Sequence, residues 1–350
     1  MSWIEFDALN GDPRWAHLVR PAASAVGLNA LPPVAHLALA SCVASFVLQR
    51  LSSTVSPTLF ARYYPTSRAK QQDWDLHMVG WVYAFVAAPL AWHLLRHPSK
   101  EVVADQLTGV ALPEQRLSAI AVGYFVWDAF VTARHIRTQG FGFFLHGAVC
   151  LCAFLFTLKP FVIWCGPAFL IWEFSSIFLN AHWLLDKLQM TGSVLQMVNG
   201  AFLVLSYIVV RLVFGTYNSY KLWNLLVPTP ESALAARALD DAGVVRWMYL
   251  ALNVAANGLN FVRLPAPSLS FPSHPLCAAV SLLWSVPPRE PQLTAHPVRS
   301  TQYWFRLMLL ALRKRFVPSP TSKSAHEAQQ KPVPVNGRLG EGQERRVKGE

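Results

Sequence analysis

The sequence is poor in charged residues. Only 14% of its 350 residues are Asp, Glu, Lys or Arg, whereas 53% are hydrophobic, and an ordinary soluble domain carries about 25% charged residues. A disordered chain needs the opposite balance, with few apolar residues and a high net charge. The composition therefore argues against a disordered protein and a soluble enzyme, and it favours a polytopic membrane protein.

The usual signatures of metal centres, disulfide scaffolds and secreted proteins are also missing. The five cysteines form no CxxC pair and lie in apolar surroundings, so they are expected to be buried small side chains. We therefore predict no metal site and no cofactor. The chain has no Asn-x-Ser/Thr sequon, and its first ten residues carry acids and no basic region, so no cleaved signal peptide is expected.

The net charge of +11 is concentrated near one end of the chain. Nine Lys and Arg residues stand against four acids between Arg313 and Glu350, and we interpret residues 317–350 as a disordered basic tail. No basic groove with interleaved aromatic residues occurs elsewhere, so nucleic acid is not predicted as a partner. A basic tail beside a hydrophobic segment fits the anionic cytoplasmic leaflet of a membrane, and it favours a cytosolic C-terminus.

Long apolar runs dominate what remains. A membrane-spanning helix needs about 20 predominantly apolar residues, and the strand alternation of a membrane barrel is absent. Since only helices and closed barrels cross a bilayer, we predict an all-α bundle of about seven transmembrane helices. The predicted spans are residues 31–51, 77–97, 117–136, 141–158, 161–185 and 193–214, with a truncated seventh at 244–261.

A proline-rich stretch follows the truncated span. Residues 262–302 hold eight of the 25 prolines, and without them Met248–Phe261 would join Tyr303–Leu312 into a run long enough to cross a bilayer. We hypothesise that 262–302 is translated from a retained intron, because Val codons begin GT and Gln302 can be CAG. A genuine insertion loop is the alternative. Consistent coverage of the stretch in mature transcripts would contradict the intron hypothesis.

Ionisable residues inside apolar spans are expensive in a bilayer, so they are candidates for function. Asp128 lies in the run GYFVWDAF, His146 in FFLHGAVCLCAF and Glu173 in LIWEFSSIFLN. A fourth residue, Arg211, lies near the end of its predicted span, where its long side chain is expected to reach the interface.

Two stripes of polar residues have helical spacing. One stripe is Glu173, Ser176 and Asn180, at i, i+3 and i+7, and the other is Asn253, Asn257 and Asn260, at i, i+4 and i+7. Together with His146 they could line one interior cavity that holds a lipid. Alternatively, they form hydrogen bonds between helices and only hold the bundle together. For the asparagines we favour the second interpretation.

The order and spacing of these runs resemble a known family. GYFVWDAF, FGFFLHGAVCLCAF, CGPAFLIWEFSSIFLNAHWLLDK and TGSVLQMVNGAFLVLSYIVVRLVFGTY are similar to the TLC-domain family, over residues 68–261. The resemblance is strongest to its fungal and animal members outside the ceramide synthases. It implies a six-helix TLC domain completed by residues 303–316, with an N-terminal segment (1–30) and a first transmembrane helix and loop (31–67) before it.

The resemblance also implies a role with lipids. Ceramide synthases carry two adjacent histidines and then acids along the next helix; here His146 is followed by Gly147, Glu173 takes the first acidic position, and Ser176 and Asn180 take later ones. We expect a multi-pass protein, in the endoplasmic reticulum, that binds, senses or regulates membrane lipids. The alternative is a sphingoid-base N-acyltransferase that uses His146, Glu173 and Asp128 with acyl-CoA. Homo-oligomerisation is left open.

Overall fold

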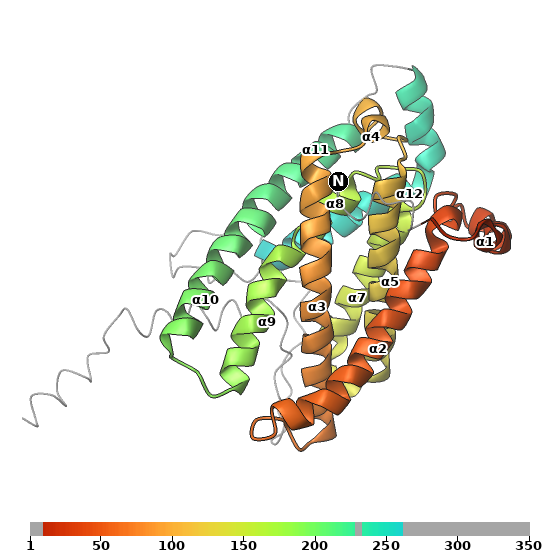
Figure 1. Ribbon diagram of the computed structural model, residues 1–350. Coiled ribbons are helices and arrows are strands. Elements are labelled where there is room, and N and C mark those ends of the chain that lie inside the picture. Colours follow the sequence, from red (N-terminus) through yellow and green to blue (C-terminus); the bar gives the residue numbers. More distant parts are fainter. Residues whose placement is uncertain (1–9, 228–232, 262–350) are drawn as a thin grey trace, which may run out of the picture. The chain divides into compact units, whose positions relative to one another are not determined.

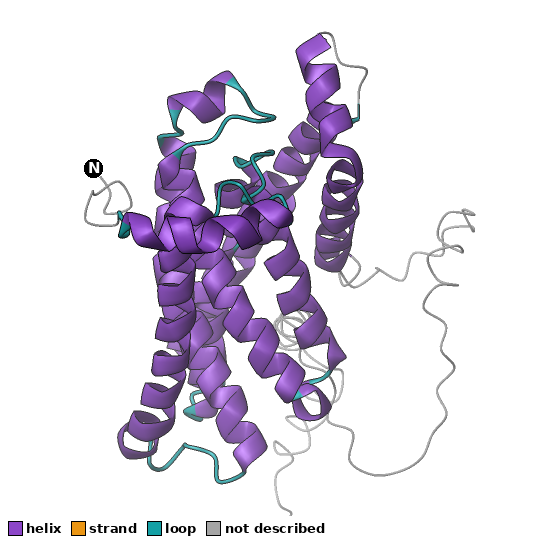
Figure 2. Cartoon of the chain, turned by 90° about the vertical axis from the view of Figure 1, so that its right-hand side faces the viewer, coloured by secondary structure: helices purple, strands orange, loops and turns teal. Residues whose placement is uncertain are grey.

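The structure is a computed structural model that describes residues 10–227 and 233–261, with a few side chains of the last helix left out. Every regular element among these residues is a helix (Figure 2). The proposed insert 262–302, the predicted completion of the last span at 303–316 and the predicted basic tail 317–350 all lie outside the described residues.

The predicted helical membrane bundle is confirmed. Five described helical stretches are long and apolar enough to cross a membrane, and Phe141–Thr157 adds a shorter apolar helix. Each of the first six predicted spans coincides with one of these helices. The elements are α1 (Pro13–Ala25), η3 (Pro32–Val34), α2 (Ala35–Leu59), α3 (Arg68–Arg96), α4 (Lys100–Ala104), α5 (Leu112–Arg134), α6 (Ile136–Gln139), α7 (Phe141–Thr157), α8 (Cys165–Leu170), α9 (Glu173–Lys187), α10 (Val194–Ser206), η4 (Tyr207–Val213), α11 (Phe214–Leu226) and α12 (Ala233–Phe261).

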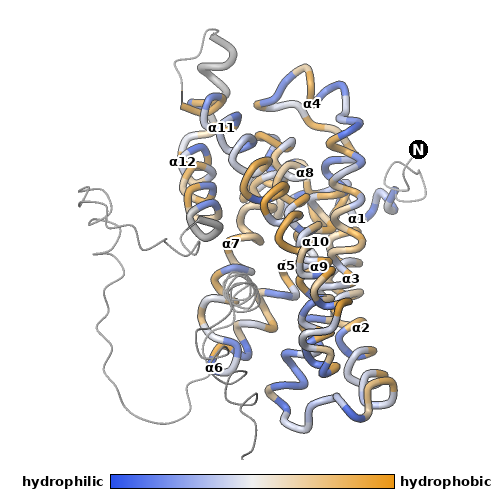
Figure 3. The backbone as a smooth tube through the Cα atoms, turned by 90° about the vertical axis from the view of Figure 1, so that its left-hand side faces the viewer, coloured by the Kyte–Doolittle hydropathy of each residue, from blue (hydrophilic) through white to orange (hydrophobic). Residues whose placement is uncertain are grey.

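The long helices lie side by side, and α1 lies across them (Figures 1 and 2). Hydrophobic residues follow the middle lengths of the long helices, and hydrophilic residues gather at the connections near both ends (Figure 3). Asp12 begins α1 by accepting a hydrogen bond from the backbone N–H of Arg14, at 2.9 Å, and Leu18 of α1 is exposed. An amphipathic helix that lies across a bundle is typical of a membrane interface.

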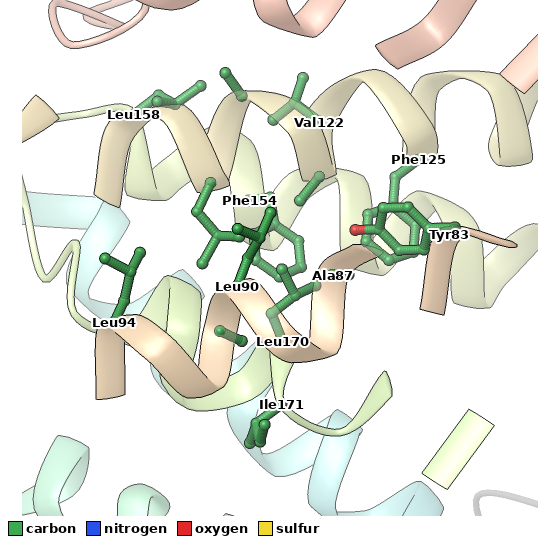
Figure 4. Packing of buried hydrophobic residues seen from close by; sticks show 14 of the residues in the cluster. Tyr83, Ala87, Leu90, Leu94, Val122, Phe125, Phe154, Leu158, Leu170 and Ile171 are labelled. Atoms are coloured by element: carbon green, nitrogen blue, oxygen red, sulfur yellow. The ribbon is translucent and has the colours of Figure 1, made fainter. Parts of the chain in front are cut away.

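The main core lies where α3, α5, α7 and α8 meet (Figure 4). Alanines line the buried face of α3, and larger residues fill the space in front of them: Leu90, Leu94, Phe125, Phe154 and Leu170. Phe125 and Phe154 stack with their ring centroids 5.5 Å apart, which joins α5 to α7. Small residues on one helix facing large ones on its neighbours allow close packing in a bilayer, where no hydrophobic effect drives helices together.

A second small-residue contact joins α2 to α5. A Cβ atom added to Gly123 would overlap the carbonyl oxygen of Ala38 on α2. Beside it, the hydroxyl of Ser41 donates a hydrogen bond to the carbonyl oxygen of Ile120, at 2.7 Å. The first transmembrane helix is therefore packed on the domain through backbone-to-backbone proximity, which only a glycine allows at this position.

Helices α10, η4 and α11 form one 33-residue stretch, Val194–Leu226, which runs as a continuous ribbon in Figure 1. At about 1.5 Å per residue this is roughly 50 Å, well beyond the roughly 30 Å hydrocarbon core of a bilayer. Its middle section, Tyr207–Val213, is a π-helix. Short π segments inside α-helices are frequent at functional sites.

The last described helix is bent. Within α12, Gly243 has φ 45° and ψ −121°, which are not helical values, and a positive φ is a conformation that glycine adopts without strain. Residues 244–261 therefore form a separate second half, as the sequence predicts. That half is not among the five stretches that meet the length and hydropathy of a membrane span.

Candidate functional site

Two carboxylates lie within electrostatic range of each other inside the bundle, one on α5 and one at the start of α9. The α5 carboxylate, Asp128, faces α7 at a glycine: a Cβ added to Gly147 would fall 2.5 Å from Oδ2 of Asp128. The α9 carboxylate is Glu173, and both side chains are half-buried. Neither accepts a hydrogen bond from any residue that the structure describes, so two acceptors inside the bundle are left without donors.

Two stacked tyrosines lie beside these carboxylates. The rings of Tyr83 on α3 and Tyr124 on α5 are parallel to within 3°, with centroids 3.6 Å apart. Both are within electrostatic range of Asp128 and Glu173. The hydroxyl of Tyr83 is buried and has no hydrogen-bond partner among the described residues. Leaving a buried polar group without a partner costs about 1–3 kcal/mol, so this hydroxyl is a further group that a ligand could satisfy.

A histidine and a cysteine on α7 lie beside these carboxylates and tyrosines. His146 is exposed, and its Nε2 atom lies 3.8 Å from Sγ of Cys150, one turn further along. Cys150 is within electrostatic range of both Asp128 and Glu173. The structure therefore brings together two of the three residues that the sequence predicts as catalytic, Asp128 and Glu173, and His146 is next to Cys150 at their side. Within the described chain, however, no hydrogen bond links His146 to either carboxylate, and a general base needs such an orienting partner.

A buried cation, Arg211, lies within electrostatic range of this α7 pair. Arg211 in the π-helix is only 8% exposed. Its Nε donates to the hydroxyl of Ser175 at 2.8 Å, and one of its terminal nitrogens contacts the carbonyl oxygen of Trp172 at 3.3 Å and the hydroxyl of Ser176 at 3.4 Å. The guanidinium also lies 5.7 Å and 5.8 Å from the ring centroids of Trp172 and Tyr207. Arg211 is within electrostatic range of His146.

The expectation that Arg211 reaches the membrane interface is wrong. The predicted span ends at residue 214, but the helix continues to Leu226. Arg211 therefore lies near the middle of the 33-residue stretch Val194–Leu226. From there the side chain cannot reach water along the helix, and it turns inward to the oxygens of α9 and of the α8–α9 junction.

The α9 stripe is divided between two neighbours. Ser176 contacts Arg211, as above, whereas Asn180 is buried against α3. Oδ1 of Asn180 lies 2.8 Å from Nδ1 of His77, and its Nδ2 donates to the carbonyl oxygen of Ser176 at 2.9 Å. Asn180 therefore holds α9 to α3, and Ser176 is the polar residue of the stripe that joins Glu173 in the cluster.

The α12 stripe binds a different helix. Nδ2 of Asn253 and Nδ2 of Asn257 donate to the hydroxyl of Ser219 on α11, at 3.0 Å and 2.8 Å. The indole N–H of Trp223 on α11 donates to Oδ1 of Asn253 at 3.2 Å. These bonds hold α11 to α12, which is the helix-joining interpretation favoured for the asparagines. The side chain of Asn260 lies outside the described part of the chain.

Sequence reasoning missed several members of the cluster. Tyr83, Tyr124 and Cys150 lie in apolar runs, and there an aromatic ring or a thiol is indistinguishable from ordinary core packing. A polar hydroxyl at mid-span is the one signal that could have marked the tyrosines. Across the described residues, no group of three or more His, Cys, Asp or Glu side chains could hold a metal ion.

The fold and this cluster define a polytopic membrane protein with ionisable groups inside its helix bundle. Its sequence matches the TLC domain family over residues 73–263, more than half of the chain. The protein therefore belongs to the TLC domain family, as the resemblance in the sequence indicates.

The chain is similar to several curated members of that family. It is 34% identical over 248 residues to an uncharacterized TLC domain-containing protein of Schizosaccharomyces pombe, covering 69% of this chain and 80% of the relative. It is 28% identical over 234 residues (61% and 82%) to topoisomerase I damage affected protein 4 of Saccharomyces cerevisiae. It is 25% identical over 218 residues (59% and 83%) to TLC domain-containing protein 4-B of Xenopus laevis. None of these relatives is named as a ceramide synthase. No solved structure is significantly similar to the chain.

Proposed function

We propose that this TLC-domain protein binds a membrane lipid, with the lipid headgroup at Asp128 and Glu173, and thereby takes part in membrane lipid homeostasis. One observation carries the proposal: two carboxylates within electrostatic range of each other accept no hydrogen bond from the described residues. Unpaired ionisable groups inside a membrane bundle are expensive, and where they occur they mark sites for ligands, ions or protons.

The chemistry of the cluster selects the headgroup. Two carboxylates are acceptors, so the matching group is a hydrogen-bond donor, either an amine or a pair of hydroxyls. An ammonium group would in addition neutralise one negative charge. The buried hydroxyl of Tyr83 can donate to an oxygen of the same headgroup. A sphingoid base or another amino lipid carries these groups beside an apolar chain that the bilayer solvates.

Binding of an amine-bearing lipid to the purified protein tests the proposal. We expect sphinganine to bind the wild type, and a long-chain alcohol of equal length, which lacks the amine, to bind at least about tenfold more weakly, as loss of one charge-assisted hydrogen bond predicts. The double variant Asp128→Asn with Glu173→Gln should lose this discrimination. Asp186→Asn is the matched control, because Asp186 lies on the same helix α9 as Glu173 and accepts a hydrogen bond from Thr191 at 2.7 Å. Equal preference for sphinganine in the double variant and the control would contradict the proposal.

A sphingoid-base N-acyltransferase is the second candidate function. It is supported by the position of His146, which lies 3.8 Å from Sγ of Cys150, a residue within electrostatic range of Asp128 and Glu173. Purified protein supplied with a sphingoid base and acyl-CoA should then form ceramide, and His146→Ala should abolish the product. Lipid that co-purifies with the protein, detected by mass spectrometry in the absence of any ceramide formation, would favour binding alone.

The endoplasmic reticulum and a cytosolic C-terminus complete the proposal. Both are expected from the family and from the basic residues near that terminus. Co-localisation of a C-terminally tagged protein with a marker of the endoplasmic reticulum, and access of an antibody to the tag after selective permeabilisation of the plasma membrane, are the expected results. An inaccessible tag would contradict the assigned topology.

A further inference from the structure

A cavity of about 190 Å³ is lined by residues of α3, α4, α8 and α11. Helix α4 and the labelled part of α11 lie at the same end of the bundle (Figures 1 and 3). The cavity shares no lining residue with the carboxylate cluster. Most of its wall is apolar and comes from the end of α3, from α4 and from α8, including Leu94, Val102 and Pro167. A concave, mostly apolar site with a few polar groups is the usual form of a small-ligand site.

One cationic side chain, Lys221, lines this cavity. The ammonium group of Lys221 lies 4.9 Å from the ring centroid of Trp164 and 5.9 Å from that of Tyr217, and it forms no ion pair with the residues that the structure describes. The acid of the cavity, Glu114, is 1% exposed. Its two carboxylate oxygens accept hydrogen bonds from the backbone N–H and the hydroxyl of Ser99, at 3.1 Å and 2.8 Å. Both oxygens of Glu114 are therefore occupied by Ser99, and Lys221 is the charged donor that lines the cavity.

One further polar group of the cavity lacks a partner in the described chain, and another has one. The indole N–H of Trp164 is buried and has no hydrogen-bond partner among the described residues. Asn218 is only 3% exposed; its Nδ2 donates to the carbonyl oxygen of Phe214 at 3.0 Å. Lys221 and Trp164 are donors without acceptors, so the matching ligand is an anion with several oxygens.

The position and size of the cavity narrow the class of anion. It lies where α3 ends at Arg96 and α5 begins at Leu112, which is the level of the lipid headgroups in a protein of this architecture. Lysine and tryptophan side chains are favoured at that level. The volume of about 190 Å³ leaves room for a phosphate group and its ester carbon. We propose that this cavity binds a phosphate group, held by Lys221 and Trp164, as the headgroup of a phospholipid.

Binding of three probes to the full-length protein in detergent tests this site. Dioctanoyl phosphatidic acid should raise the unfolding temperature. Dioctanoylglycerol has the same chains but no phosphate, so it should leave the unfolding temperature unchanged. Inorganic phosphate tests whether the site takes a soluble ligand. Lys221→Gln should weaken the binding of phosphatidic acid at least about tenfold, as loss of a charge-assisted hydrogen bond predicts. Lys221→Arg should retain it, because the positive charge is kept.

Lys187→Gln is the matched control. Its ammonium group also lies over a tryptophan, 5.6 Å from the ring centroid of Trp183, but it does not line this cavity. Binding of inorganic phosphate that Lys221→Gln abolishes would support the phosphate site and assign a soluble source. Equal binding of phosphatidic acid and dioctanoylglycerol, or equal binding of phosphatidic acid by Lys221→Gln and Lys187→Gln, would overturn the proposal.

Discussion

Two sets of polar side chains lie inside this bundle, and they differ in how far the protein satisfies their hydrogen bonds. Between α11 and α12, Asn253 and Asn257 both donate to the hydroxyl of Ser219, and Asn257 also donates to the carbonyl oxygen of Asn253. Of these two side chains, Oδ1 of Asn257 is left without a partner among the described residues. Around Asp128 and Glu173, two acceptors receive no hydrogen bond from the described residues. The first set stabilises the fold and the second is available to a ligand, although both present the same signal in the sequence, a polar residue inside an apolar run.

Arg211 is the residue whose loss should weaken the fold most. Arg211→Ala removes the hydrogen bonds to Ser175, Ser176 and the carbonyl oxygen of Trp172, and bonds to a charged group contribute about 1.5–3 kcal/mol each. We expect the free energy of unfolding in mixed micelles to fall by about 3 kcal/mol. Arg134→Ala, at the exposed end of α5, is the control and should change it by less than about 0.5 kcal/mol. A similar change in the free energy of unfolding for the two variants would show that the hydrogen bonds of Arg211 do not stabilise the fold.

Breaking the asparagine set should cost less and leave lipid binding intact. Asn253→Ala leaves Ser219 and the indole N–H of Trp223 without this partner, and hydrogen bonds between helices in membranes contribute about 0.6–2 kcal/mol. The expected loss of stability is about 1 kcal/mol, measured by denaturant titration. Sphinganine binding should be unchanged; a parallel loss of binding would mean that the two sets of polar residues are not independent.

The carboxylate set should respond in the opposite way. Asp128→Asn removes the repulsion of Glu173 and supplies an N–H donor beside it, so the lipid-free protein should be as stable as the wild type or about 1 kcal/mol more stable. Binding of the amine lipid should fall about tenfold, since a charge-assisted hydrogen bond is lost. A variant that is less stable and binds normally would reverse the distinction between the two sets.

Asp105, in the loop after α4, shows what a satisfied carboxylate does outside the spans. Burial tends to raise its pKa, but hydrogen bonds from the hydroxyl and N–H of Thr108 and the N–H of Leu107 outweigh this and hold the pKa below its ordinary value of 3.8. Because the pKa of Asp105 is lower in the folded state, its ionised carboxylate stabilises the protein at pH values above about 4. This stabilisation is lost as the pH falls below that value.

Asp105→Ala should therefore produce the smallest of these effects. Because the carboxylate is largely solvated, we expect a loss of about 0.5 kcal/mol at pH 7. The difference in unfolding temperature between Asp105→Ala and the wild type should narrow as the pH is lowered from 7 to 3. A difference that stays constant over this range would show that the hydrogen bonds of Asp105 do not depend on its charge.

The sequence predicts the architecture well because a bilayer imposes simple demands on each helix separately. The apolar runs locate six helices, and the ionisable residues within them mark Asp128 and Glu173, which the structure brings together. They also mark His146, which lies beside Cys150. Pairing between helices is not encoded in any single run. The contact of Asn180 with His77 and the stacking of Tyr83 on Tyr124 each join residues far apart in the chain. The inward turn of Arg211 was missed because buried polar residues after residue 214 look like the end of a span.

The π-helix at Tyr207–Val213 also determines how any helical wheel of this segment must be drawn. A π turn closes its hydrogen bond one residue later than an α turn, so each residue after it is displaced by about 100° around the helix axis. A wheel drawn without interruption from Val194 to Leu226 would thus assign Ser219 to the wrong side. The chain length of this segment, as well as its composition, fixes which residues α10 presents to α9 and which α11 presents to α12. In a relative that lacks one residue of this segment, the residues that α10 presents to α9 or that α11 presents to α12 would therefore differ.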